Sequence, residues 1–492
     1  MTARKSAPAA DPLPLADYLP QIQGLVLRGY SHHFVRYFAL CVRPEAVGEA
    51  RTFLDTISGG VTGAFPQITS AVDWGVPRPS STLNLAFTMN GLKNIGVPQS
   101  TLASFFQQQL DHVPFIDGSV DHAADVGDAN SSFTSWNAPP WRIDDSMFDV
   151  LLIVYGDTPE VIEAQSVVLR GLFRAGFTEL QNENLVLDCQ DLPANLVYFD
   201  YHDGIAQPHI AGNPFVEKPD GGQPPVDPGG FLLGMGTQQP WTNIPVPTPA
   251  QFGKLGTFAA FRIMRQHLDA FENFLVTQLP NFKQLYPFFP NTLEGDRVAR
   301  DALKAMLVGR WPNGTPLAMW PVTGPSPAPA KPEQELNDFL YPAPAAVGGC
   351  PFGAHIRRTN PRDEQNPALP HRIMRRAMPY QIPYCPTDRY SGEVGLMGLF
   401  LCASLAQQFD FVLGQWVNNA APETPSANYD QADPVIGNHP PVLNPPPPPG
   451  DAIVVTLDDS GALSIANFTQ TVGSAYVFIP SLPSIRWVAA LT

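Results

Sequence analysis

The stretch FDVLLIVY at residues 148–155 is an almost unbroken run of apolar residues, most of them β-formers. A run without polar alternation is typical of a strand that is buried on both faces of a sheet. Immediately after it, Thr158 offers a capping hydroxyl and Pro159 suits the first turn of a helix, which we expect to extend to about Phe173. The stretch therefore predicts a buried strand followed by a helix that packs on the sheet.

The same order of strand and helix occurs earlier in the chain. Residues 35–42 are rich in β-formers, and residues 45–57 repeat apolar side chains at helical spacing. Residues 83–88 offer a second strand in this half. The first half is thus expected to contain a sheet with helices beside it.

The second half repeats the pattern. Residues 257–264 and 396–402 favour strands, and apolar stripes at helical spacing follow them at 268–279 and 405–416. A last apolar run at 475–480 is expected to close the second sheet. Together the two halves predict a duplicated α+β fold, in which each half is an antiparallel sheet with helices on one side. The alternative is an accidental symmetry, because strand-then-helix units are common.

The distribution of the 55 prolines divides the chain further. We expect a flexible N-terminal tail at 1–18, an N-terminal half at 19–215, a Pro/Gly-rich connection at 216–255 and a C-terminal half at 256–492. A proline-rich insertion at 422–450 interrupts the second half, with five consecutive prolines near its end.

Charge and cysteine content exclude several classes of function. The 492-residue chain has a formal net charge of -16, from 45 acidic and 29 basic residues. Such a field repels polyanions, so neither nucleic acid nor an anionic membrane is an expected partner. The five cysteines are scattered without CxxC spacing, which argues against a disulfide framework or a zinc ribbon. Without an apolar N-terminal core or a run of about 18 apolar residues, a cytoplasmic protein is expected.

One histidine has an unusual setting. His355 is followed within seven residues by Arg357, Arg358, Asn360 and Arg362. A neutral imidazole can bind a metal ion, and the polar groups after it suit the anionic edge of a cofactor. The alternative is a basic loop on an acidic protein.

Two further candidates have simple structural alternatives. Asp203 lies in YHDGIAQP, where a carboxylate could move a proton or could only form an Asx turn. Arg375 precedes Arg376, and either guanidinium could stabilise negative charge, or both could be solvated.

These stretches together resemble the dye-decolourising peroxidases, a family of haem peroxidases, and in particular its longer-chain subgroup. The resemblance extends from about residue 20 to 485. It rests on residues 22–30, the LNLxFTxxGL-like segment 83–98, the GxxDG and IxQP motifs within 200–208, the strand and helix at 256–275, AHIRRxNPR at 354–362, RRGxPY at 375–380 and the QFxFxxxQWxN-like end of 395–418.

The resemblance implies a pair of ferredoxin-like halves with haem in the C-terminal half. It implies that His355 is the axial ligand of the iron, that Asp203 is the distal acid–base carboxylate and that Arg375 is the distal arginine. No CxxCH motif is present, so the cofactor is expected to be non-covalent haem b.

The same resemblance implies roles for further residues. Asp433 is the candidate carboxylate partner of the axial histidine. The expected haem contacts are Asn360, Pro361 and Arg362 after the ligand, Gly204 and Ile205 on the distal loop, and Leu399 and Leu401 on an apolar distal wall.

Three positions depart from the family pattern. Asp200 replaces the first glycine of GxxDG, Ala377 replaces the glycine of RRGxPY, and Gly230 stands where a glutamate is frequent. If the first of these positions requires a positive φ, Asp is among the few residues that tolerate it.

The implied activity is oxidation of bulky donors, such as dyes and phenolics, by hydrogen peroxide. Asp203 and Arg375 would assist heterolysis to a ferryl intermediate, and surface Trp or Tyr residues would relay electrons to buried haem. The alternatives are a haem carrier or sensor without efficient turnover, or a non-haem protein on the same scaffold. A monomer or homodimer is expected.

Overall fold

The computed structural model describes most of the chain. The described residues are 14–59, 65–105, 113–128, 143–180, 187–215, 223–237, 244–332, 335–341, 349–362, 369–385, 387–418, 432–437, 454–458, 461–464 and 467–492. Of the expected N-terminal tail, residues 1–13 lie outside these ranges, while Leu15–Gln21 forms a 3-10 helix. Most of the expected insertion at 422–450 and parts of the connection at 216–255 also lie outside them.

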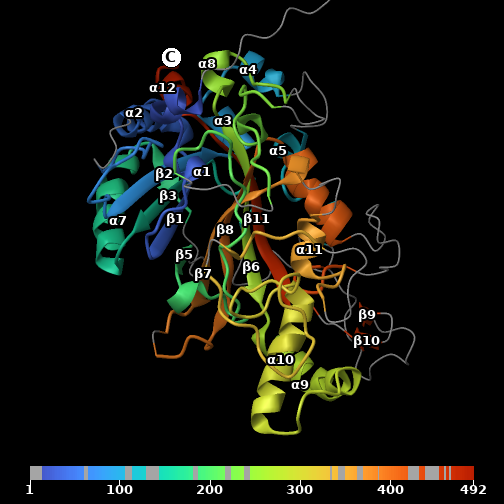
Figure 1. The fold of residues 1–492 in the computed structure, drawn as a ribbon. Helices are drawn as coiled ribbons and strands as arrows, with labels where there is room; N and C mark the ends of the chain where they lie inside the picture. Colours follow the sequence, from blue (N-terminus) through green and yellow to red (C-terminus); the bar gives the residue numbers. More distant parts are fainter. Residues whose placement is uncertain are drawn as a thin grey trace, which may run out of the picture.

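One antiparallel sheet of nine strands forms the centre of the molecule (Figure 1). Its order is β4-β1-β3-β2-β11-β6-β8-β7, and β5 also pairs with β1. The strands are β1 (Phe34–Val42), β2 (Ser81–Phe87), β3 (Val150–Gly156), β4 (Phe177–Glu179), β5 (Asp188–Gln190), β6 (Thr257–Gln266), β7 (Met374–Ile382), β8 (Glu393–Cys402) and β11 (Thr469–Ile479). A separate pair consists of β9 (Val454–Asp458) and β10 (Gly461–Ser464).

The two predicted halves adjoin within this sheet. Strands β1 to β5 come from the first half, and β6, β7, β8 and β11 come from the second. The C-terminal strand β11 belongs to the sheet of the second half, as the sequence predicted, where it pairs along its length with β6. It also meets β2 through Phe478 and Phe87. The predicted α+β class is confirmed, and β11 is the strand that brings the halves together.

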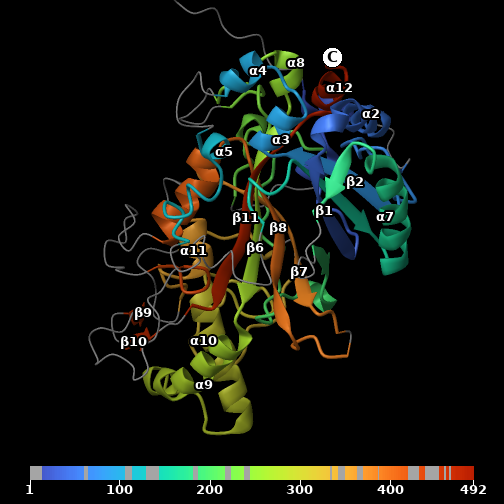
Figure 2. The same cartoon turned by 180° about the vertical axis from the view of Figure 1, so that it is seen from behind.

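Helices flank the sheet at both ends (Figures 1 and 2). The longer ones are α2 (Val47–Ile57), α7 (Pro159–Phe173), α9 (Leu268–Leu285) and α10 (Leu293–Val308), and the shorter ones are α1 (Gly24–Leu27), α3 (Met89–Asn94), α4 (Gln99–Ser104), α5 (Val113–Asp117), α8 (Ala250–Gly253), α11 (His355–Thr359) and α12 (Leu482–Ala489). Helices α2 and α7 lie beside β1–β3, whereas α9 and α10 lie at the far end of β6.

The strand that first indicated the fold behaves as predicted. All seven residues of β3 are buried, and its side chains alternate between two hydrophobic cores on opposite faces of the sheet. The Thr158 hydroxyl accepts a hydrogen bond from the backbone N–H of Val161 at 3.3 Å, so the predicted cap starts α7.

The helix predicted after β8 differs from expectation. Leu405–Phe409 and Val412–Val417 are two π-helical segments, here η9 and η10, and the predicted apolar stripe on them is buried. The amide of Gln408 turns inward, accepting from the N–H groups of Ala403 and Ser404 and donating to the Gly230 carbonyl. A polar side chain thus satisfies backbone groups at the start of the first segment. Such π-helical turns often accompany functional sites.

Within the described residues, none of the helices combines the length and the apolar character that crossing a bilayer requires.

Candidate active site

The His355 side chain is held by a buried carboxylate. His355 is the first residue of α11, and its Nδ1 lies 2.9 Å from Oδ2 of Asp433. Because Nδ1 faces an acceptor, it carries the proton, and Nε2 is the nitrogen that can bind a metal ion. The two residues are 78 positions apart in the chain, and the structure places them together as the sequence hypothesis required.

Backbone N–H groups hold the Asp433 carboxylate in position. Asp433 is fully buried, and its Oδ1 accepts hydrogen bonds from the N–H groups of Val435 at 2.9 Å and Ile436 at 3.0 Å. Burial acts to raise the pKa of Asp433, but the His355 ring and these donors outweigh it and hold the pKa below its usual value. An ionised carboxylate on Nδ1–H makes the imidazole a stronger electron donor.

Asp203 and Arg375 form a second pair. Nη1 of Arg375, on β7, lies 3.6 Å from Oδ1 of Asp203, which is in the loop after β5. Side-chain exposure is 33% for Arg375 and 46% for Asp203, so small molecules can reach both groups. The Gln207 side chain accepts a hydrogen bond from the Arg375 backbone N–H at 2.9 Å and so ties the loop to the strand.

Opposing effects set the pKa of Asp203. Desolvation raises the pKa, but the Arg375 charge and the Gly204 N–H lower it, with smaller contributions from His355 and His202. The net result is a pKa below the usual value of an aspartate. Because the His355 ring acts on this carboxyl, the two parts of the site lie within electrostatic range of one another.

The neighbouring arginine faces away from Asp203. Arg376 donates from Nε to the Leu25 carbonyl at 2.8 Å and lies near Tyr30 and Tyr155, and burial lowers its pKa to about 10. Successive side chains on a strand point to opposite faces of the sheet. The structure therefore places Arg375, and not Arg376, beside the distal loop.

The expectation for Leu399 and Leu401 was wrong. In the β7–β8 ladder, Leu401 is opposite Met374, Leu399 is opposite Arg376, and Phe400 is opposite Arg375. Directly opposed residues share a face, so both leucines lie on the face away from Arg375. The partly buried ring of Phe400 lies opposite Arg375 and is an apolar neighbour on its face.

The three departures from the family pattern are accommodated. Asp200 has a φ of 58°, and its Oδ1 accepts hydrogen bonds from Arg389 and from the Tyr390 hydroxyl. Gly230 contributes its carbonyl, which accepts from the Ala403 N–H. Ala377 is opposite Gly398 in the sheet, where the missing side chain of Gly398 leaves it room.

Two buried guanidiniums meet near the distal loop. Arg310 and Arg362 both donate to Oδ1 of Asn337, at 2.8 and 3.0 Å, and Nδ2 of Asn337 donates to the Ile205 carbonyl. Among the described residues, the acceptors of Arg310 are all uncharged oxygens. Burial and the nearby Arg362 charge lower the pKa of Arg310 to about 10. The Arg310 guanidinium is thus a buried positive charge, which an anionic group would stabilise.

Sequence reasoning missed Arg310 and Asn337. Both lie outside the motifs that carried the resemblance, and neither has a local pattern that marks it. They were recognisable only when the fold brought residues 310, 337 and 362 together.

Sequence reasoning also missed Gln223 and Arg372, which lie beside the predicted haem contacts Asn360 and Pro361. Pro361 is buried, and Nδ2 of Asn360 donates to Oε1 of Gln223 at 3.2 Å. Arg372 donates to the same Gln223 oxygen and approaches the Ala206 carbonyl at 3.5 Å. Gln223 and Arg372 therefore connect the segment after His355 with the distal loop.

Comparison with known proteins identifies similar chains. A dye-decolorizing peroxidase of Auricularia auricula-judae is 28% identical over 89% of this chain and 82% of its own length. A multifunctional dye peroxidase of Amycolatopsis is 25% identical over 96% of both chains. A crystal structure of a decolorizing peroxidase from Auricularia auricula-judae superimposes with a TM-score of 0.75 at 26% identity, covering 96% of this chain and all of the other. No protein-family model matches the chain.

The Asn337 cluster leads to a stability prediction. Asn337→Ala removes a buried acceptor from two guanidiniums and a donor from the Ile205 carbonyl, so we expect the free energy of unfolding to fall by about 2–3 kcal/mol. The control Asn281→Ala removes an exposed amide that, within the described part of the chain, donates to Gln278 on the same helix, and it should change the free energy of unfolding by less than about 0.5 kcal/mol. Urea denaturation measures both, and equal effects would show that the Asn337 cluster is not a structural anchor.

Proposed function

Because this chain belongs to the dye-decolourising peroxidase family, we propose that it binds haem b at His355 and uses hydrogen peroxide to oxidise bulky organic donors, with Asp203 and Arg375 as the proton-transfer pair. One observation carries the proposal. An ionised Asp203 and the Arg375 guanidinium, 172 residues apart in the chain, form a partly accessible pair within electrostatic range of a carboxylate-bound histidine.

The residues present fit a haem group. His355 offers a single imidazole, and one axial imidazole suffices when the porphyrin supplies the other iron ligands. Among the described residues no cluster of three or more His, Cys, Asp or Glu side chains could hold a bare metal ion. Arg310 and Arg362 offer positive charge for propionates, and a side chain added at Gly204 would meet no atom within 4 Å, so the distal loop leaves room for a flat ring.

Asp203 is the proposed acid–base group that transfers the proton of the peroxide. Haem held by His355 would supply the redox chemistry of the reaction with peroxide. Asp203 is ionised at rest, so it can accept the proton of the inner oxygen and return it to the outer oxygen, which leaves as water. The lowered pKa of Asp203 keeps the base available in mildly acidic solution.

Arg375 supports this transfer in two ways. Its charge lowers the pKa of Asp203, and its guanidinium can stabilise the negative charge that develops on the peroxide oxygens. The hydrogen bond from its backbone to Gln207 holds the distal loop in register with β7. Dyes and phenolics are the proposed donors, and the names of the related enzymes refer to dyes.

The first test is haem binding. His355→Ala should give a folded protein without tightly bound haem, seen as loss of the Soret band, because the axial nitrogen is removed. His33→Ala is the matched control, since His33 forms a comparable 2.7 Å pair with Asp191 at the surface. Full haem occupancy in His355→Ala would exclude His355 as the ligand. Parent protein that binds haem but does not respond to one equivalent of peroxide would be a carrier or sensor.

The arginine pair gives a second prediction. Arg375→Leu should slow the reaction with peroxide by a factor of about 100 or more, as loss of a preorganised charge stabiliser does. Arg376→Leu should slow it much less, because Arg376 lies on the other face of β7. Stopped-flow absorbance of the Soret band measures both rates, and the reverse ranking would reject the assignment.

The pH dependence gives a third prediction. Asp203 has a lowered pKa, so its function as a base persists below neutral pH and is lost as the pH falls through that value. Donor oxidation should therefore persist on the acid side of neutral and fall only as the pH approaches that value. Asp203→Asn should bind haem normally and react slowly with peroxide across this range. A peroxide step at the parental rate in Asp203→Asn would leave Asp203 as a turn residue only.

A further inference from the structure

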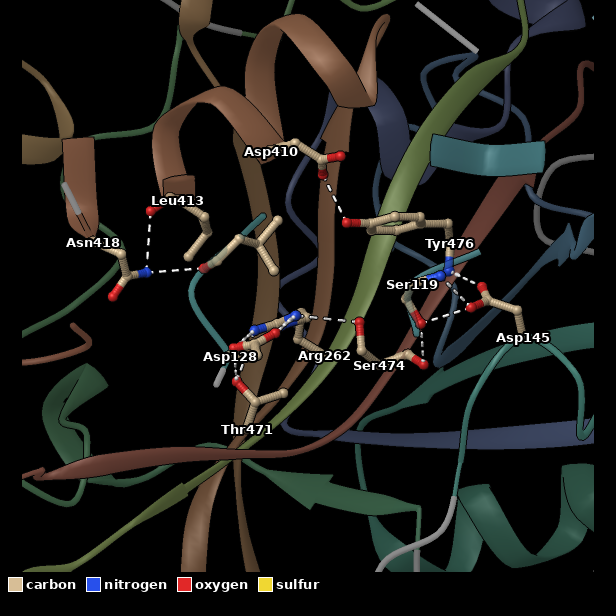
Figure 3. Close-up of polar contacts among 11 residues, drawn as sticks. Ser119, Asp128, Asp145, Arg262, Asp410, Leu413, Asn418, Thr471, Ser474 and Tyr476 are labelled. Atoms are coloured by element: carbon tan, nitrogen blue, oxygen red, sulfur yellow. Dashed lines mark hydrogen bonds and ion pairs between the residues drawn. The ribbon is translucent and has the colours of Figure 1, made fainter. Parts of the chain in front are cut away.

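A buried polar cluster lies between β6, β11 and the segment that contains Asp128, between α5 and β3 in the chain (Figure 3). Arg262 on β6 is 3% exposed and forms a two-pronged ion pair with Asp128, with distances of 2.7 and 2.8 Å. It also donates to the hydroxyl groups of Thr471 and Ser474 on β11. The Arg262 charge is therefore compensated inside the protein by Asp128. Of the two other carboxylates in the cluster, Asp145 accepts from the Ser119 hydroxyl and from the Tyr476 backbone N–H.

Asp410 instead binds a tyrosine. Tyr476 on β11 is 1% exposed, and its hydroxyl donates to Oδ1 of Asp410 at 2.7 Å. Figure 3 shows the phenol and the carboxylate pointing toward one another. The other oxygen of Asp410 lies 3.3 Å from Nδ1 of His122.

A line of titratable groups connects this carboxylate with solvent. The His122 ring is 15% exposed and faces Asp125 at 3.5 Å and Asp117 at 3.8 Å. The side chains of Asp125 and Asp117 are 73% and 47% exposed. A proton that leaves the Tyr476 hydroxyl thus has acceptors in sequence from the core to the surface.

The same tyrosine is connected to the candidate active site across the sheet. Arg375 is opposite Phe400, Phe400 is opposite Ala260, and Ala260 is opposite Tyr476 in successive ladders. These four residues form one row on one face of β7, β8, β6 and β11, which spans about 14 Å at about 4.8 Å per strand. The Phe409 ring covers the row, with its centroid 5.6 Å from Phe400 and 6.1 Å from Tyr476.

We propose that Tyr476 is a redox-active tyrosine that donates one electron to the oxidised active site and passes its phenolic proton to Asp410. The proposal rests on the peroxidase function proposed above, because the reaction with peroxide supplies the oxidant. In the step, the oxidising equivalent left in the enzyme takes one electron from Tyr476. The O–H bond of the phenol breaks, and its proton binds Oδ1 of Asp410. The products are a neutral tyrosyl radical and a protonated carboxyl. An electron from a donor reverses the step.

The proton acceptor explains why this tyrosine is suited to the role. A tyrosine that loses an electron becomes a strong acid, so a buried phenol is oxidised readily only when a base lies within hydrogen-bond distance. Tyr30, by contrast, donates to the neutral amide oxygen of Asn84, which is not a base that can take up its proton. Burial raises the pKa of Asp410 above its usual value, against the opposing effects of His122 and Tyr476, and so makes it a stronger base.

The experiment is electron paramagnetic resonance of the haem-loaded protein, frozen rapidly after one equivalent of peroxide. The parent should show a tyrosyl signal. Tyr476→Phe should reduce it to the background level, while the optical change at the Soret band keeps its parental rate. Asp410→Asn keeps a hydrogen-bond acceptor but not a base, so it should retain the fold and lower the radical yield several-fold.

Tyr390→Phe is the matched control. Tyr390 also donates to a carboxylate, that of Asp200, but it is 45% exposed and lies outside the row of residues described above. Its replacement should leave the signal in place. A tyrosyl signal that survives in Tyr476→Phe, or a parent without such a signal despite a normal Soret response, would overturn the proposal. A parent that gives no Soret response to peroxide would instead reject the peroxidase function itself, and the tyrosine role with it.

Discussion

The alternation of side chains across one antiparallel sheet is the constraint on which the site depends. Because successive residues of β7 face opposite sides, Arg375 reaches Asp203 while Arg376 reaches Leu25. The same alternation assigns Phe400, and not its leucine neighbours, to the active face. A shift of one residue in the β7–β8 register would exchange every one of these roles.

The protein contains several buried charges, in the candidate site and beside the sheet. Buried ionic groups are tolerated when partners or hydrogen bonds compensate them. Asp433 has two backbone donors and an imidazole, and Arg262 has the two oxygens of Asp128. Arg310 differs, since its acceptors within the described residues are uncharged, and this is the reason to connect it with an anionic cofactor.

Distance along the chain explains the layout of the protein. His355 and its carboxylate partner are separated by 78 residues, and the Tyr476–Asp410 pair by 66. The C-terminal strand β11 lies between the two halves, so the end of the chain joins them and also presents Tyr476 to the cluster around Arg262. Loss of this strand would therefore affect the sheet and the polar cluster together.

The sequence by itself determined the local features. Local sequence properties account for the apolar run of β3, the Thr158 cap and the conformational tolerance of Asp200. The motifs around His355, Asp203 and Arg375 indicated which side chains could act in a peroxidase site. The choice of Asp433 also came from the sequence, through the resemblance and not through a local pattern. Only the tertiary structure decided which side chains meet: the face that Phe400 occupies, the convergence of Arg310 and Arg362 on Asn337, and the π-helical form of residues 405–417. The physical reason is that these contacts join segments far apart in the chain, where strand register and burial, and not local propensity, fix the partners.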